Sequence, residues 1–159
     1  TKARAARGAR ALVADAPLMP HNTKPKMIPS SAKGKKSTTE FKLLSESSLG
    51  WALWEATTSF LRPHQVRVHA AVQELPVMGD VLYAGPEAPL LSALLPNKRT
   101  SGIKFPVLDG LALHLREVIL PAFGEEAAAV SLRAELPRHF RVMLQRMQLS
   151  LPEAETTEA

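Results

Sequence analysis

The sequence predicts an α+β domain with a mainly antiparallel, mixed sheet and flanking helices. Short segments of alternating apolar and polar residues recur along the chain, and two longer segments carry apolar residues at helical spacing. The 159 residues suffice for one domain with a core of ordinary size, and the 45% apolar content is typical of globular proteins. Thirteen prolines and few aromatic residues predict many strand ends and turns around an aliphatic core.

The first 36 residues are expected to form a basic segment that is partly loop. Residues 1–14 begin with helix-forming residues and end in a short apolar run. An arginine-rich start without acidic residues also resembles an organelle transit peptide, although no initiator methionine precedes it. Residues 15–36 carry four prolines and five lysines and show no hydrophobic period, which predicts a loop.

An ordered domain is expected over residues 37–148. TTEFKLL alternates in polarity and WALWEATTSF is rich in aromatic and β-branched residues, so we expect a hairpin of strands near 37–44 and 51–59. Pro63 suits the first turn of a helix, and HQVRVHAAVQEL continues at helical spacing until Pro76 ends it.

The second half of this domain is expected to add two strands and a helix. Residues 85–110 are interrupted by proline and glycine around the apolar patch PLLSALL. LALHLREVIL then alternates as a strand, and AAAVSLRAEL is its expected partner. LPRHFRVMLQRMQ predicts a final helix that packs through Phe140, Leu144 and Met147. The acidic tail, 149–159, is expected to fray.

Positive charge is concentrated in the first quarter of the chain. Residues 1–42 carry ten Lys and Arg against Asp15 and Glu40, whereas residues 43–159 are slightly acidic. A basic surface on a near-neutral body indicates a polyanion partner. Nucleic acid is favoured over a membrane because no amphipathic helix with an aromatic face accompanies the charge. A solvated or disordered basic arm is the alternative.

Several other classes of site are disfavoured. The absence of cysteine excludes disulfides, thiolate zinc sites and cysteine nucleophiles. His64 and His69 are five residues apart without a third ligand nearby, so no metal is expected. Ser59, His64 and Asp80 are the residue types of a catalytic triad, but the sequence lacks a nucleophile elbow and a glycine-rich oxyanion loop, so no triad is expected. The sequence has no apolar run long enough for a membrane span and no glycine pattern for nucleotide binding.

The segment RPHQVRVH, residues 62–69, places cationic and hydrogen-bonding side chains at the start of a predicted helix. LPVMGDVLY, residues 75–83, follows it closely. Free N–H groups at a helix start, together with arginines, suit a phosphate or a carboxylate. The alternative is a surface helix with ordinary charges.

These two segments resemble the RxHQIRVH and P-x-x-GD-x-x-Y motifs of RluA-type RNA pseudouridine synthases. The resemblance extends over residues 9–148 and corresponds to the C-terminal part of that family's catalytic domain. Further agreement lies in Gly34-Lys35 with the strand 37–41, in Leu113-His114, and in Leu136-Pro137 with Phe140. The structural motif positions would be Gly79, Asp80, Tyr83 and His114.

The resemblance implies an isomerase that converts uridine to pseudouridine, in ribosomal or other structured RNA, without metal or cofactor. Arg67 matches the arginine that pairs with the nucleophilic aspartate. Positions beside the RNA backbone and the flipped nucleotide are matched by Arg62, His64 and Gln65. Sequence-independent phosphate contacts are expected from Lys24, Lys26, Lys33, Lys35 and Lys36. The implied location is the bacterial cytoplasm or, alternatively, the mitochondrial matrix.

Departures from the family pattern keep a second interpretation open. The family nucleophile lies in an HRLD-type motif, and none of Asp15, Asp80 and Asp109 follows Arg-Leu here. We therefore expect the nucleophile segment to be missing from these 159 residues, and this chain alone to be inactive. Ala9 stands at the place of a family tyrosine, and Phe60-Leu61-Arg62 replaces the family's Thr-Gly-Arg. The alternative is a non-catalytic RNA-binding or ribosome-assembly paralogue, and the oligomeric state is not predicted.

Overall fold

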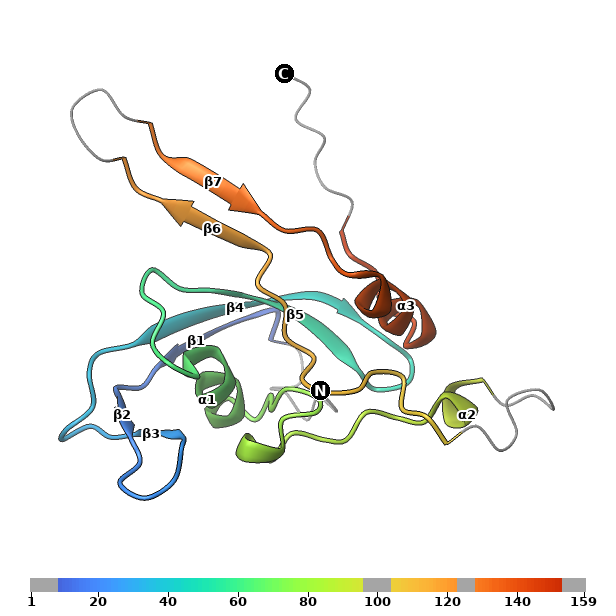
Figure 1. Cartoon of the computed structure of the whole chain (residues 1–159), viewed down its shortest axis with the longest axis horizontal. Coiled ribbons are helices and arrows are strands. Elements are labelled where there is room, and N and C mark those ends of the chain that lie inside the picture. Colours follow the sequence, from blue (N-terminus) through green and yellow to red (C-terminus); the bar gives the residue numbers. More distant parts are fainter. Residues whose placement is uncertain (1–8, 96–103, 123–127, 153–159) are drawn as a thin grey trace.

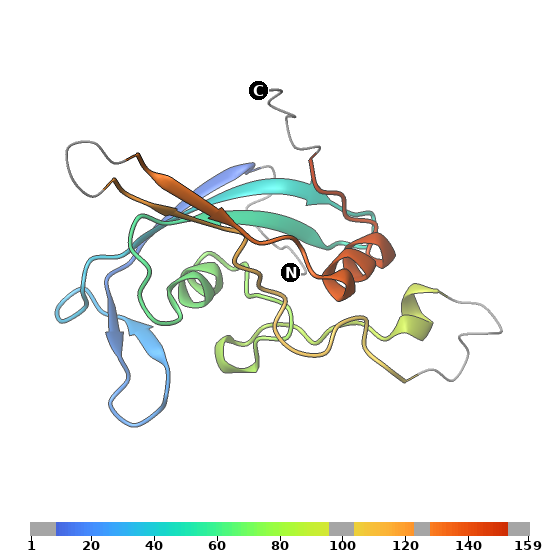
Figure 2. The ribbon, with the colours of Figure 1, turned by 45° about the horizontal axis from the view of Figure 1, so that its top comes forward.

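The computed structural model describes residues 9–95, 104–122 and 128–152. It confirms the α+β class, and every strand pair within those ranges is antiparallel. The main sheet has the order β1–β4–β5, formed by Ala11–Asp15, Thr38–Glu46 and Ala52–Thr57 (Figure 1). Helix α1, Gln65–Val72, lies against one face of this sheet, as Figure 2 shows.

Strands β4 and β5 form the hairpin that the sequence predicts. Along β4, Thr39 and Phe41 are buried while Glu40 and Lys42 face solvent, which is the two-residue period of a half-buried strand. The register between the strands shifts between Leu43 and Ser45. This alternation turns Thr39 and Phe41 toward α1, so β4 supplies both polar and apolar contacts to the helix.

Helix α1 is shorter than its sequence pattern predicts. It begins at Gln65, because His64 before it adopts a left-handed conformation with φ of +54°. At the other end Glu74 is left-handed, with φ of +58°. The N–H groups of Glu74 and Leu75 donate to the carbonyls of Ala71 and Ala70, at 3.1 and 2.8 Å. This hydrogen-bond pattern closes the helix ahead of Pro76.

Residues 15–36, which the sequence predicts as loop, instead form a small second sheet. Strands β2, Leu18–Pro20, and β3, Met27–Pro29, pair antiparallel, and the backbone of Lys35 bonds to that of Leu18 in both directions. The strands are only three residues long, too short for a recognisable period. Leu18 and Met27 are buried against Val68 of α1, which anchors the segment. We call residues 18–36 the basic hairpin.

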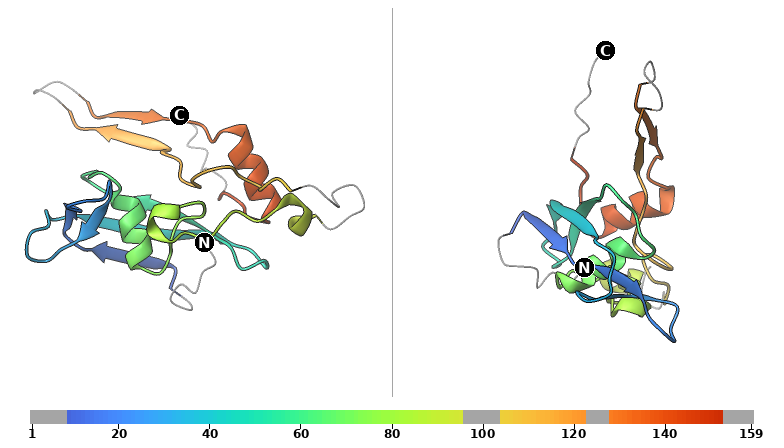
Figure 3. Two further views of the ribbon diagram at one scale, coloured as in Figure 1. Left: turned by 60° about the horizontal axis from the view of Figure 1, so that its bottom comes forward. Right: turned by 90° about the vertical axis from the view of Figure 1, so that its left-hand side faces the viewer.

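The rest of the chain contains a one-turn helix α2, a second hairpin and helix α3. Helix α2 is Leu91–Leu94, the hairpin pairs β6, Glu117–Leu120, with β7, Val130–Arg133, and α3 is Arg138–Arg146. The strand predicted over 111–120 forms only at β6, because no described strand pairs with residues 111–116. The β6–β7 hairpin stands away from the main sheet in both views of Figure 3.

Three apolar clusters hold these elements together. One joins the main sheet to α1, and a second joins the basic hairpin to α1. The third and largest packs α3 against β5 and the loop before β6, and its buried members are Trp51, Met78, Leu108, Met143, Leu144, Met147 and Leu149. Phe140 packs at its margin, so the predicted packing face of α3 is confirmed.

Two predicted terminal features lie outside the described residues: the helix-like start over 1–8 and most of the acidic tail, 153–159. Within the described ranges, the helices are all too short and too polar to cross a membrane.

Two glycines with the same backbone conformation allow a test of the packing around the GD motif. Gly79 has φ of +79°, and a Cβ there would overlap the carbonyl oxygen of Gly110. Gly50 has φ of +77°, and a Cβ there would have no neighbour within 4 Å. Gly50→Ala should therefore cost only backbone strain, about 1 kcal/mol. Gly79→Ala should cost about 2 kcal/mol more, because it adds a steric overlap with backbone.

Urea unfolding of the two variants, followed by tryptophan fluorescence, measures both losses. Equal losses of unfolding free energy would show that the close approach of Gly79 to Gly110 does not exist in solution.

Candidate functional site

The two motif segments meet through an ion pair between Arg67 on α1 and Asp80. Arg67 donates two hydrogen bonds, from Nε to Oδ2 and from Nη2 to Oδ1 of Asp80, both at 2.7 Å. The Asp80 side chain has no exposed surface, whereas that of Arg67 is 19% exposed. Asp80 Oδ1 also accepts the backbone N–H of Tyr83 at 3.2 Å, which caps the 3-10 helix η1, Val81–Tyr83. One carboxylate thus fixes both the arginine and η1.

The charges of this pair are mutually stabilising. Burial by itself would raise the pKa of Asp80, but the Arg67 guanidinium and the backbone N–H groups of Tyr83 and Leu82 outweigh it and lower the pKa below its ordinary value. The hydrogen bond to Asp80 likewise raises the pKa of Arg67, against the effect of desolvation. Both groups are therefore ionised at neutral pH.

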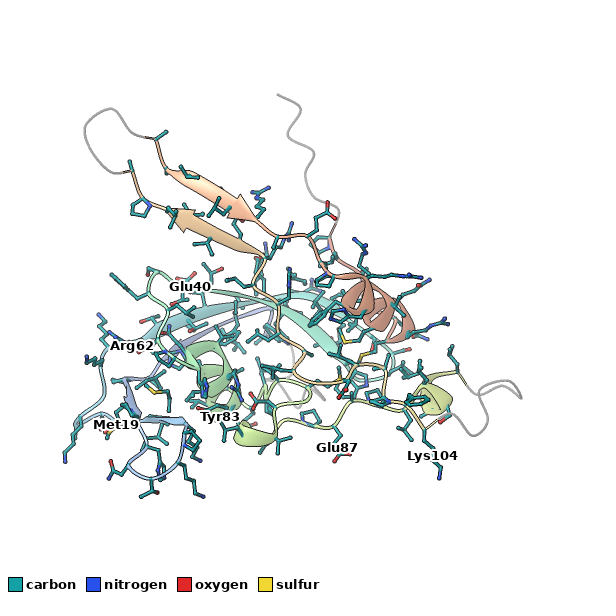
Figure 4. The ribbon with its side chains drawn as sticks, in the orientation of Figure 1. Met19, Glu40, Arg62, Tyr83, Glu87 and Lys104 are labelled. Carbon is teal, nitrogen blue, oxygen red and sulfur yellow. The ribbon has the colours of Figure 1, made fainter. Side chains whose placement is uncertain are left out.

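Tyr83 joins three parts of the site (Figure 4). Its ring centre lies 5.1 Å from the Arg67 guanidinium carbon, a cation–π distance. Its hydroxyl accepts the backbone N–H of Met27 at 2.8 Å and lies 3.0 Å from Nδ1 of His64. Burial raises the pKa of Tyr83. His64 and Arg67, which the helical spacing places on one face, both contact Tyr83, and through it the basic hairpin is held beside α1.

Gln65 lies in the interior and not at the predicted RNA surface. It is 1% exposed, and its Nε2 lies 2.8 Å from Thr58 Oγ1, 3.0 Å from the Thr38 carbonyl and 3.2 Å from Thr39 Oγ1. Its Oε1 accepts the backbone N–H of Arg62 at 3.0 Å. Gln65 therefore holds the loop before α1 in place, and a direct contact with RNA would require this amide to leave its partners.

His69 is also a buried, hydrogen-bonded residue. It has no exposed surface, and its ring nitrogens lie 2.8 Å from Thr39 Oγ1 and 3.0 Å from the Ala16 carbonyl. It links α1 to β4 and to the end of β1. Within the described residues, no group of three His, Cys, Asp or Glu side chains is placed to hold a metal ion.

The predicted phosphate contacts lie on the surface of the basic hairpin and next to it. The exposed lysines are Lys24, Lys33, Lys35 and Lys36, and Lys26 is half-buried. Arg62, also half-buried, donates from Nε to the Lys36 carbonyl at 3.1 Å. Figure 4 shows Arg62 on the same side of the molecule as Met19 of β2. The cations of the hairpin and of the loop before α1 thus form one surface, which we call the basic surface.

The remaining motif positions serve the scaffold in this structure. His114 Nε2 lies 3.3 Å from the Ala134 carbonyl, and its ring centre is 6.0 Å from that of Phe140. It therefore attaches the segment before β6 to α3. Gly79 permits the close approach of Gly110.

Two residues that organise this site carry no signal of that role in the sequence. Thr39 of β4 contacts both Gln65 and His69, and Thr58, just after β5, contacts Gln65. The bridge from Tyr83 to Met27, 56 residues away, was not predicted either. The alternation of β4 indicates that Thr39 faces inward, but a hydroxyl gives no signal of its distant partners. Tyr83 was recognised only as a motif position.

Comparisons with known proteins agree with the two motif segments. No family model matches the chain. It is 32% identical over 131 residues to the human mitochondrial pseudouridylate synthase RPUSD4, covering 77% of this chain and 33% of that protein. It is 27% identical over 129 residues to an uncharacterised RNA pseudouridine synthase of Synechocystis sp., covering 79% and 33%. The chain spans about a third of the length of these curated relatives.

Solved structures give the same result. The human RNA pseudouridylate synthase domain-containing protein 4 superposes with a TM-score of 0.62 and 27% identity, over 90% of this chain and 58% of that one.

The lowered pKa of Asp80 predicts a specific pH dependence of stability. Asp80→Asn leaves the Arg67 guanidinium without its charged partner, and we expect a loss of about 2–3 kcal/mol in unfolding free energy at pH 7. An aspartate whose pKa is lower in the folded than in the unfolded state stabilises the fold fully when the pH is above its unfolded-state pKa, about 3.9. This stabilisation is lost as the pH falls through the folded-state pKa. The difference from wild type should therefore be constant from about pH 5 to 8 and shrink below about pH 4.

Urea unfolding across this range measures the difference, with Asp109→Asn as a control that removes a loop carboxylate. A difference that widens as the pH falls would contradict the direction of the Asp80 shift.

Proposed function

The chain belongs to the RluA-type family of RNA pseudouridine synthases, and we propose that it forms the RNA-binding, C-terminal part of such an enzyme's catalytic domain. The observation that supports this most directly is the joining of the two motif segments by Arg67, Asp80 and Tyr83 beside the basic surface. The proposed reaction of the complete enzyme is isomerisation of uridine to pseudouridine in RNA, with no metal or cofactor. The chain itself spans about a third of the length of these relatives, so the proposed reaction belongs to the complete enzyme.

Arg67 is proposed to orient the nucleophile. Its Nε and Nη2 are held by Asp80, which fixes the guanidinium plane, and the described residues supply no partner for Nη1. The N–H groups of Nη1 could then donate to the nucleophilic aspartate and keep that carboxylate ionised. Asp80 is a poor candidate for the nucleophile itself, since its buried side chain cannot reach a base. The attacking carboxylate is therefore proposed to come from outside these 159 residues.

The basic surface is proposed to bind the RNA backbone next to the target uridine. Lysines of the basic hairpin and Arg62 would neutralise phosphates, and His64, two residues after Arg62, contacts the same Tyr83 as Arg67. A uridine within a structured RNA must leave its stack to reach a buried site. We propose ribosomal RNA as the substrate.

For location we propose the mitochondrial matrix. The human relative RPUSD4 and the mouse relative Rpusd3 are both mitochondrial, which supports this location. The relative from Synechocystis supports the bacterial cytoplasm as the alternative.

A non-catalytic RNA-binding paralogue is the second candidate, and the Arg67–Asp80 ion pair is compatible with it. A buried arginine without a carboxylate would be costly, so an Arg67 with no partner in this chain would argue for a nucleophile supplied from elsewhere. Asp80 already provides that carboxylate. The presence of Arg67 alone therefore does not distinguish an enzyme from a binding protein.

The activity of the isolated chain tests where the nucleophile lies. The 159-residue chain should bind ribosomal RNA but form no pseudouridine, because its own aspartates cannot supply the nucleophile. Carbodiimide labelling followed by mass spectrometry detects the product, and a complete RluA-type synthase acting on the same RNA is the positive control. Pseudouridine made by this chain would overturn the assignment of the nucleophile to another segment, and a failure to bind RNA would overturn both candidate functions.

A further prediction concerns the basic surface. Replacing Lys24, Lys26 and Lys36 together by Gln should flatten the slope of log K against log salt by roughly two to three units, at about 0.7–0.9 for each lost phosphate contact. The control removes the same charge from α3, by Arg138→Gln, Arg141→Gln and Arg146→Gln. A slope that changes equally in both variants would mean that only net charge matters and that the hairpin is a solvated arm.

A further inference from the structure

The loop between β5 and α1 exposes two large apolar side chains. Phe60 is 79% exposed and Leu61 is 68% exposed, whereas Phe41 and Trp51 are buried in the core. These two residues stand where the chain departs from the Thr-Gly of the family motif. A single exposed apolar residue is common on protein surfaces. What distinguishes this pair is the way the loop is held and the charge beside it.

The loop around Phe60 is held by hydrogen bonds to half-buried Thr58 before it and to buried Gln65 after it. The Thr58 hydroxyl lies 2.9 Å from the Phe60 carbonyl and 2.8 Å from the Thr38 carbonyl, and it accepts a hydrogen bond from Gln65 Nε2. On the other side, the N–H of Arg62 donates to Gln65 Oε1 at 3.0 Å. Because this short loop is anchored at both ends, a ligand on Phe60 would lose little affinity to loop ordering.

Phe60 stands in a loop that also carries positive charge. Arg62 is two residues away and is bonded through Nε to the Lys36 carbonyl. Lys35 and Lys36 are exposed at the same edge of the basic surface. Two acids lie near this loop: Glu40 of β4, on this side in Figure 4, and Asp15, whose Oδ1 accepts the Thr38 hydroxyl at 3.0 Å. The three cations Arg62, Lys35 and Lys36 outnumber them. An aromatic ring can stack on the base of a nucleotide, and the cations around it can bind the phosphate.

We propose that Phe60, with Leu61 beside it, is a stacking platform for an unpaired nucleobase of an RNA strand whose phosphates contact Arg62 and Lys36. The inference rests on the proposed RNA-binding function and adds a contact that the family motif does not provide. Every base has a π-face, so the platform accepts any sequence. Bases inside a duplex are already stacked on one another, so the platform favours single-stranded and loop regions.

The test compares two RNA probes, an oligouridine of about twelve nucleotides and an RNA duplex of the same length. Phe60→Ala should weaken binding of the full 159-residue chain to the oligouridine by about 5- to 100-fold, the usual effect of losing one aromatic stacking partner. Binding to the duplex should change by less than about twofold. Since no charge is lost, the salt dependence should keep its slope.

Two further variants make the result specific. Phe60→Trp should retain the affinity of wild type, because the larger ring still stacks. Phe105→Ala is the matched control: Phe105 is 74% exposed, but it lies next to Lys104, which Figure 4 shows on the side of the molecule away from Arg62. Its removal should leave oligouridine binding unchanged. Both rings are exposed, so neither substitution should lower the unfolding temperature, and thermal unfolding checks that each variant is folded.

An unchanged oligouridine affinity in Phe60→Ala would overturn the proposal, as would an equal loss for oligouridine and duplex. Full oligouridine affinity in Phe60→Leu would show that the contact does not need an aromatic ring, which would also overturn the stacking proposal. Failure of the wild-type protein to bind either probe would refute the proposed RNA-binding function. That result differs from the ones that overturn the stacking proposal alone.

Discussion

A buried carboxylate is the constraint around which this site is organised. Asp80 has no contact with water, so its charge must be balanced by protein groups, and the two-pronged donor of Arg67 supplies most of that balance. The same carboxylate caps η1 and thereby sets the position of Tyr83. Tyr83 in turn binds the backbone of Met27. A desolvated charge thus fixes Tyr83 beside the basic hairpin, and the apolar contacts of Leu18 and Met27 with Val68 complete the attachment of the hairpin to α1.

On the opposite side of α1, the buried side chains of Gln65 and His69 need hydrogen-bond partners. Gln65 and His69 have almost no exposed surface, and their partners come from β4 and from the ends of β1 and β5. Helix α1 is therefore held by polar contacts on its sheet side and by an ion pair on its η1 side. An element fixed on two sides can present His64 and the loop before it in a constant geometry.

The elements with long or repeated patterns could be predicted from the sequence, and those defined by distant contacts could not. The β4–β5 hairpin and α3 follow from alternation and helical spacing within their own residues. The basic hairpin could not be foreseen, because its three-residue strands are stabilised by Val68 and Tyr83, far along the chain. Motif spacing located Arg67 and Asp80, but not that they bind each other. The burial of Gln65 could not be predicted either, because a motif does not state which way an amide points.

The β6–β7 hairpin has a consequence for how the chain behaves in solution. Val118, Leu120, Val130 and Leu132 occupy one face of it and are 38–55% exposed, while Glu117 and Arg133 pair on the other. A two-stranded ribbon with two free edges and an uncovered aliphatic face is marginally stable in water and is a template for intermolecular strand addition. In the isolated chain, strand addition between copies is therefore expected to begin at this ribbon and not at the charged surface around α1.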